Sequence, residues 1–153
     1  MYVTEKGTRE LPGVTIGDSS VENFGWQWFH GWQGIIPSQS TLEDCKILLG
    51  EVTETSELAN GMTYDFLHGQ VRITILDGSS HVFKAWIDRQ AAFPFTPPPT
   101  IDDASEYFGR LITTGVNRYE GCLLERPGMR ICCNAMDETN PILWMEIWKP
   151  QAT

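Results

Sequence analysis

The side chains that could carry chemistry in this sequence are few. Adjacent carboxylates occur at Glu43-Asp44 and again at Asp102-Asp103. A carboxylate pair that works as acid and base needs a cleft that gives its two members different environments. Each of these pairs instead follows a threonine at the predicted start of a short helix, where the helix dipole favours negative charge. We therefore interpret both pairs as capping charges rather than as catalytic groups.

The histidines are the other side chains that titrate near neutral pH, and they are His30, His68 and His81. No nucleophile motif accompanies them, and they are too scattered for a zinc site. No glycine-rich phosphate loop is present either. The sequence therefore predicts a protein that is not an enzyme and that holds no metal and no cofactor.

The cysteines are Cys45, Cys122, Cys132 and Cys133, and no two of them form a C-x-x-C pair. A tight turn at Pro127-Gly128 would bring Cys122 near either Cys132 or Cys133 across a hairpin. In an oxidising compartment such a pair could close, whereas in the cytosol we expect buried thiols.

Two similar phrases, STLEDCKILLG and PTIDDASEYFG, organise the chain. Thr41 and Thr100 are candidate N-caps, and each is followed three residues later by an aspartate that could complete a capping box. A glycine follows the last apolar residue of each phrase, as expected just beyond a helix end. The pattern predicts short helices at 42–49 and 101–108.

Alternating strands and short polar turns follow both phrases, which favours antiparallel hairpins. We predict an α+β fold of two tandem repeats, each a short helix followed by three antiparallel strands, with the helices packed on one face of a continuous sheet. The predicted organisation, within one compact domain, is an N-terminal extended segment with a tryptophan-rich strand (1–34), repeat unit 1 (35–90), a proline-rich connector (91–99) and repeat unit 2 (100–153).

Strand alternation divides the side chains between two faces. The apolar side chains expected under the helices are Val71, Ile73, Ile75, Phe83, Ala85, Ile87, Met129, Ile131, Cys133, Leu143, Met145 and Ile147. The opposite face combines tryptophan, arginine and acid, which is the composition of binding hot spots. The predicted partner-binding residues are Trp26, Trp28, Trp32, Arg72, Trp86, Arg130, Trp144, Glu146 and Trp148.

Two other interpretations of these residues stay open. The tryptophans could pack between the two repeats or under the N-terminal segment, since aromatic side chains are common in large cores. The arginines Arg72 and Arg130 could simply pair with Glu146 or with an acid on a neighbouring strand.

The net charge is −9, so the chain would on average be repelled by nucleic acids and by anionic lipids. No apolar stretch is long enough to span a membrane, and the first residues do not resemble a signal peptide. We expect a cytoplasmic protein that binds no nucleic acid and no membrane. Its expected partner is another protein, of basic character if charge steers the encounter.

The helix phrases resemble the T-x-x-x-V-x-x-x-L-G phrase of SmpA/OmlA-type outer-membrane lipoproteins. The tandem arrangement is similar to that of the secreted β-lactamase inhibitory proteins, and the likeness covers roughly residues 35–148 in pattern. This chain lacks a lipobox cysteine near its start and paired cysteines within each unit. The resemblance implies a helix-plus-sheet architecture and a habit of binding proteins, and it implies no catalytic residue.

These observations favour a non-enzymatic protein-binding module, such as an inhibitor, immunity factor, anti-defence protein or assembly factor. The alternative is a small-molecule-binding protein or hydrolase with a pocket where the two repeats meet. A homodimer that buries the tryptophan face against a second copy is a further alternative.

Overall fold

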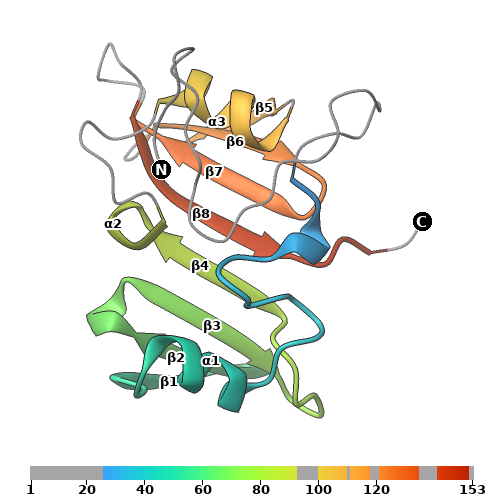
Figure 1. The fold of residues 1–153 in the computed structure, drawn as a ribbon, viewed down its shortest axis with the longest axis vertical. Helices are drawn as coiled ribbons and strands as arrows, with labels where there is room; N and C mark the ends of the chain where they lie inside the picture. Colours follow the sequence, from blue (N-terminus) through green and yellow to red (C-terminus); the bar gives the residue numbers. More distant parts are fainter. Residues whose placement is uncertain (1–25, 93–99, 110, 118–120, 135–140, 152–153) are drawn as a thin grey trace.

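The computed structural model describes residues 26–92, 100–109, 111–117, 121–134 and 141–151. It contains one antiparallel sheet of eight strands in the order β1-β2-β3-β4-β8-β7-β6-β5 (Figure 1). The strands are β1 (Glu54–Leu58), β2 (Gly61–Phe66), β3 (Val71–Leu76), β4 (Lys84–Asp88), β5 (Ile112–Asn117), β6 (Gly121–Arg126), β7 (Met129–Cys133) and β8 (Ile142–Trp148). The helices are α1 (Leu42–Leu49), α2 (Arg89–Ala92) and α3 (Ile101–Phe108), with 3-10 turns η1 (Trp28–His30) and η2 (Leu67–Gly69).

The two longer helices begin and end where the sequence predicts, and the same local chemistry fixes both. In α1, the Asp44 amide donates to Thr41 Oγ1 (3.2 Å) and the Thr41 amide donates to Asp44 Oδ2 (2.9 Å). In α3, Thr100 and Asp103 make the same reciprocal pair, at 3.4 and 2.9 Å. The interpretation of Asp44 and Asp103 as capping carboxylates is therefore confirmed.

Each of these helices is followed by four strands, and not by the three that the sequence predicts. The first half of the molecule runs from α1 to β4, and the second half runs from α3 to β8. The additional strands are β1 and β5, which form the two edges of the sheet. All five residues of β1 are exposed, so this strand has no apolar alternation by which its sequence could be recognised.

The halves join where β4 pairs with β8. This ladder is antiparallel and centred on Trp86 opposite Glu146, with Lys84 opposite Trp148 and Asp88 opposite Trp144. A single sheet therefore continues through both halves, with the first-half strands on one side of the junction and the second-half strands on the other.

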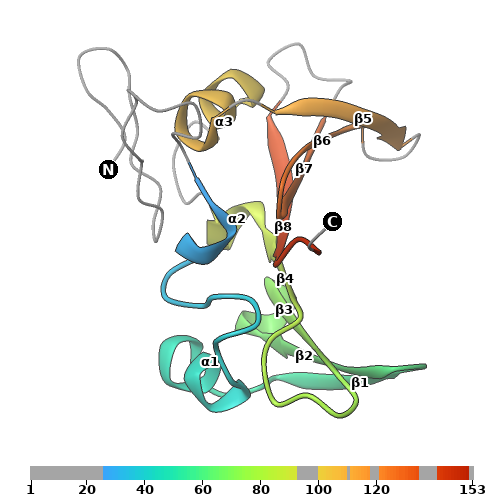
Figure 2. The same cartoon turned by 90° about the vertical axis from the view of Figure 1, so that its right-hand side faces the viewer.

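The helices lie on one side of this sheet, which we call the helix-covered face (Figure 2). Its buried side chains form a single core with residues of α1, α3 and the segment before α1: Trp26, Trp32, Ile35, Cys45, Phe66, Val71, Ile73, Val82, Ala85, Ile87, Ala92, Ala104, Phe108, Met129, Ile131, Ile142, Met145 and Ile147. The edge strands β1 and β5 project toward the other side, so the sheet curves around its helix-free face (Figure 2).

Two residues that the sequence places in the core are less buried than predicted. The ladder between β7 and β8 changes register after Cys132, which pairs with Trp144, so that Cys133 lies opposite Ile142. Because of this irregularity Ile142 is fully buried, whereas Leu143, predicted for the core, is only half-buried. Phe83 is 45% exposed because it lies outside β4, which begins at Lys84, whereas the sequence predicts a strand that already includes Phe83.

Within the described residues, no helix has the length and apolar character that crossing a membrane requires. Much of the N-terminal segment and most of the predicted connector (93–99) lie outside the described residues. The predicted unit boundaries therefore stay predictions.

Candidate interaction surface on the sheet

A row of charged and aromatic side chains crosses the middle of the helix-free face. Its members are successive cross-strand neighbours on six adjacent strands, in the order Asp65, Arg72, Trp86, Glu146, Arg130 and Glu125. Residues directly opposite one another in an antiparallel ladder lie on the same face, about 5 Å apart at Cβ. The backbone register is therefore what brings these side chains together.

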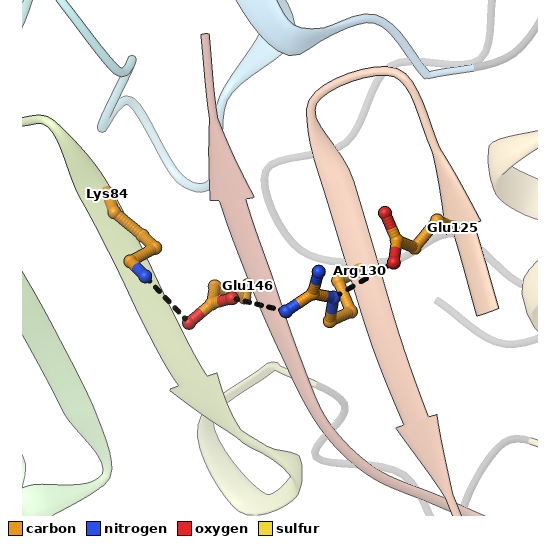
Figure 3. A network of polar contacts seen from close by, with 4 residues as sticks. All are labelled: Lys84, Glu125, Arg130 and Glu146. Atoms are coloured by element: carbon orange, nitrogen blue, oxygen red, sulfur yellow. Dashed lines mark hydrogen bonds and ion pairs between the residues drawn. The ribbon is translucent and has the colours of Figure 1, made fainter. Parts of the chain in front are cut away.

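The second half of the row is an ion-pair network (Figure 3). Arg130 Nε donates to Glu125 Oε2 at 3.1 Å, and Arg130 Nη1 lies 3.9 Å from Glu146 Oε1. The other oxygen of Glu146 lies 3.5 Å from Lys84 Nζ on β4. Because the Glu146 side chain is only 15% exposed, these two cations compensate for the water that its carboxylate has lost.

The first half of the row is looser. Arg72 Nε lies 3.4 Å from Asp65 Oδ1, and the Arg72 side chain remains 57% exposed. The guanidinium carbon of Arg72 lies 5.5 Å from the ring centroid of Trp86, within the range of a cation–π contact. The interpretation that both arginines pair with acids on neighbouring strands is confirmed, but Arg72 keeps most of its donors in solvent.

Two more tryptophans, Trp144 and Trp148 on β8, flank this row. The rings of Trp86 and Trp144 are 6.2 Å apart and inclined at 41°, and Arg130 lies 5.9 Å from the Trp148 ring. All three tryptophans are half-buried, and within the described part of the chain the helices lie on the opposite face. The predicted residues Arg72, Trp86, Arg130, Trp144, Glu146 and Trp148 are thus brought together on one surface.

The remaining predicted residues, Trp26, Trp28 and Trp32, do not join that surface. Trp26 and Trp32 are buried in the core, and Trp26 packs edge-to-face against Phe108 at 6.5 Å. Trp28 is half-buried and contacts the C-terminal segment, with Lys149 Nζ 5.2 Å from its ring. The prediction that these three tryptophans share one binding face is therefore wrong.

The physical reason is that residues 26–32 do not form the expected strand. The chain makes a 3-10 turn at Trp28–His30, closed by the Gln27 amide donating to His30 Nδ1 at 2.9 Å. Gly31 then adopts a φ of +62°, and a Cβ there would lie 2.2 Å from the Ile35 carbonyl oxygen. Only glycine fits this close approach, and the reversal sends the tryptophans on either side into the core.

The histidines do not converge. His30 is bound within its own turn, and burial lowers the pKa of its imidazole. His68 lies in η2, and the backbone and side chain of His81 bond to neighbouring serines. Among the described residues, no cluster of three or more histidines, cysteines or carboxylates could hold a metal ion.

The structure decides between the two pairings that the sequence left open for Cys122. Cys45 and Cys132 keep their thiols, whereas Cys133 is disulfide-bonded. The hairpin places the backbone of Cys122 directly opposite Cys133. Of the two pairings considered for Cys122, the one with Cys132 is therefore excluded.

A small cavity of about 190 Å³ opens where the two halves meet on the helix-free face. Its lining residues are Phe83, Lys84, Arg130, Glu146 and Trp148. None of the histidines contributes to it, and its volume is below the roughly 300 Å³ at which small-molecule sites usually begin. This geometry resembles the pocket for an inserted side chain more closely than a site for a free ligand.

The predicted binding residues omit three members of this surface, Asp65, Lys84 and Glu125, although strand alternation places Lys84 on the same face as Trp86. Lys84 alternates with Trp86 along β4 and could have been selected by that signal. Asp65 and Glu125 are identified only by the register that sets each of them opposite an arginine.

No protein-family model, curated protein or solved structure matches this chain. The surface therefore has to be interpreted from its own chemistry.

Proposed function

We propose that this chain is a non-enzymatic protein-binding module that docks a partner protein on the helix-free face of its sheet. The observation that carries the proposal is the grouping of Trp86, Trp144 and Trp148 with two arginines on that face. Half-buried tryptophans offer a partner a large apolar area at low entropic cost, and arginine and tryptophan dominate interface hot spots.

The ion-pair network supports this proposal by providing rigidity. Glu146, Arg130 and Lys84 hold one another, so the tryptophans beside them stand on a preorganised surface. A partner that docks there loses less conformational entropy than it would on a mobile surface. The cavity beside Trp148 gives one partner side chain a place to insert.

The partner that we propose is another protein, and its binding surface is basic. The described charges on the helix-free face are Glu54, Asp65, Asp88, Glu125 and Glu146 against Arg72, Lys84 and Arg130. Acids therefore outnumber bases by five to three on this face, and the whole chain carries −9. The excess of acids on this face and the negative charge of the whole chain both speed the encounter with a basic surface.

We also propose that the two halves derive from one duplicated unit. The paired capping boxes support this, and so does a second correspondence between the helix starts. Thr41 forms a bridge with His81, just before β4, and Thr100 forms one with Pro141, just before β8. A duplicated helix-plus-sheet unit accords with the resemblance to SmpA/OmlA-type proteins and β-lactamase inhibitory proteins, which implies protein binding.

The proposal is tested by quantitative affinity capture from a lysate of the source cells. The tagged baits are the wild type, Trp144→Ala, Arg72→Glu and, as a control on the other side of the sheet, Ile47→Ala, which alters an 81%-exposed side chain of α1. We expect a protein that the wild type and Ile47→Ala retain equally and that the other two variants lose at least tenfold.

Thermal unfolding of each bait separates binding from folding. If Trp144→Ala fails to fold, Arg72→Glu still decides, because the Arg72 side chain is 57% exposed. Equal capture by all four baits would contradict the proposal. Sedimentation of the wild type and Arg72→Glu distinguishes the homodimer alternative, in which the wild type alone would associate with itself.

A further inference from the structure

A second surface lies at the edge of the sheet, away from the tryptophans. A cavity of about 460 Å³ opens between α1 and the β1–β2 hairpin, on the helix-covered face. Its lining residues are Leu42, Lys46, Gly50, Glu51, Val52, Thr55 and Tyr64. This volume lies in the range of sites that accept a ligand, and its walls mix apolar and polar groups.

One wall of this cavity is the edge strand β1. Within the described part of the chain, β1 pairs with β2 on one side and with no strand on the other. Every second residue of an edge strand points its backbone N–H and C=O away from the sheet, so such an edge can accept an added strand. An extended segment placed along β1 would direct alternate side chains toward the helix-covered face, where the cavity lies.

The negative charge around this edge indicates which kind of segment it attracts. Glu51 lines the cavity, and Glu54 and Glu57 are exposed on β1. The nearby cation, Lys46, is already engaged by Glu43 at 3.3 Å. A second copy of this chain is disfavoured, because pairing β1 with β1 would place four glutamates on two adjacent strands. A basic segment would be attracted instead.

We propose that the groove between α1 and β1 binds an extended, basic peptide segment of another protein. The segment adds to the sheet as a strand beside β1 and inserts one apolar side chain against Leu42, Val52 and Tyr64. Its lysine or arginine side chains lie against Glu54 on the helix-free face and against Glu51 and Glu57 on the helix-covered face. This site is independent of the surface proposed above, since β1 is at the edge of the sheet and the tryptophans are at its centre.

The probe is a phage-displayed library of random nine-residue peptides, selected on the wild-type chain. We expect enrichment of sequences that combine several basic residues with an apolar residue for the cavity. The most enriched sequence is then synthesised in three forms: unmodified, methylated at alternate backbone nitrogens, and with its basic residues replaced by glutamate. We expect both altered forms to bind at least tenfold more weakly, because they lose the strand hydrogen bonds and the charge attraction, respectively.

Two neighbouring substitutions on β1 provide a matched pair. Thr55 lies opposite Tyr64 and faces the cavity, whereas Ser56 lies opposite Thr63 on the other face, and both are exposed. Thr55→Trp should fill the cavity and weaken the unmodified peptide at least tenfold, measured by fluorescence anisotropy. Ser56→Trp should change its affinity less than twofold.

Three results would overturn this inference. They are a selection that enriches no peptide, an enriched peptide whose backbone-methylated form binds as well as the unmodified form, and equal effects of the two tryptophan substitutions.

Discussion

The two faces of the sheet use the same kinds of residue for different purposes. On the helix-covered face, Trp26 and Trp32 are buried among aliphatic side chains. On the helix-free face, Trp86, Trp144 and Trp148 are half-buried beside arginines and carboxylates. The difference shows that the course of the backbone decides whether a tryptophan lies in the core or on the surface. A reversal at Gly31 accompanies the burial of Trp26 and Trp32, whereas alternation along β4 and β8 places the other three on the helix-free face.

The largest expected effect tests this division of the tryptophans. Trp26→Ala should lower the free energy of unfolding by about 3–5 kcal/mol, because it leaves a cavity in the core and removes the indole N–H bond to the Gly31 carbonyl (3.0 Å). Trp144→Ala should cost about 1–2 kcal/mol, since this side chain is already partly in solvent. Urea denaturation measures both, and similar losses would remove the distinction between the two faces.

A second test uses the titration of Cys45, a buried thiol on the helix-covered face. Burial, with the nearby Asp44 charge, raises the pKa of the Cys45 thiol to about 11 from an ordinary value of 9.0. The unfolded chain therefore releases this proton first, and stability that is fully present below pH 9 is lost as pH rises toward 11. The loss should be about 2 kcal/mol.

The matched control for this titration is Cys45→Ala, since Ala104 fills the corresponding place in α3. The variant should lack the part of the alkaline decline that belongs to Cys45. Identical pH profiles for the two proteins, measured by urea denaturation between pH 8 and 11, would show that this thiol is not protected by folding.

A third test compares the two ends of the charged row. Arg130→Ala should destabilise the protein by about 1–2 kcal/mol, because Glu146 keeps one cation and Glu125 loses its bond. Arg72→Ala should cost no more than about 0.5 kcal/mol, since its single ion pair is largely solvated. Equal losses in urea denaturation would mean that the row is uniform and that Arg72 is not specially available to a partner.

A fourth test concerns the caps of the two helices that cover one face of the sheet. Thr41→Ala and Thr100→Ala each remove a capping hydroxyl and should each cost about 1 kcal/mol. The matched Ser replacements should restore most of the loss, because serine also caps. Thermal unfolding checks this, and a cost in only one helix would indicate that the two capping boxes do not contribute alike.

How much of this could be predicted from sequence depends on the range of the interaction involved. The helices 42–49 and 101–108 were predictable because Thr41, Thr100 and their aspartates act within three residues. The face assignments of Arg72, Trp86 and Trp144 were predictable because alternation along a strand is local. The edge strand β1 was not, since an all-exposed strand carries no apolar period.

Residues 26–32 show the opposite case, because their sequence predicts a strand that the structure does not contain. Their alternating aromatics fit a strand, but Gly31 allows a reversal that alternation does not reveal. The pairing of Arg72 with Asp65 was likewise out of reach, because it requires the register of β2 against β3, which only the folded chain defines. Contacts between strands were therefore the main part of the surface that sequence reasoning left undetermined.

The Trp86–Glu146 pair at the centre of the β4–β8 ladder has a consequence for recognition. Were two identical units to meet along this ladder, the central residue would face its own copy, and a ligand could settle in either of two opposite directions with equal affinity. A single polypeptide is free of that constraint, and here an indole stands against a carboxylate. A partner that docked across this junction would meet a polarised site, and its two opposite directions would differ in affinity.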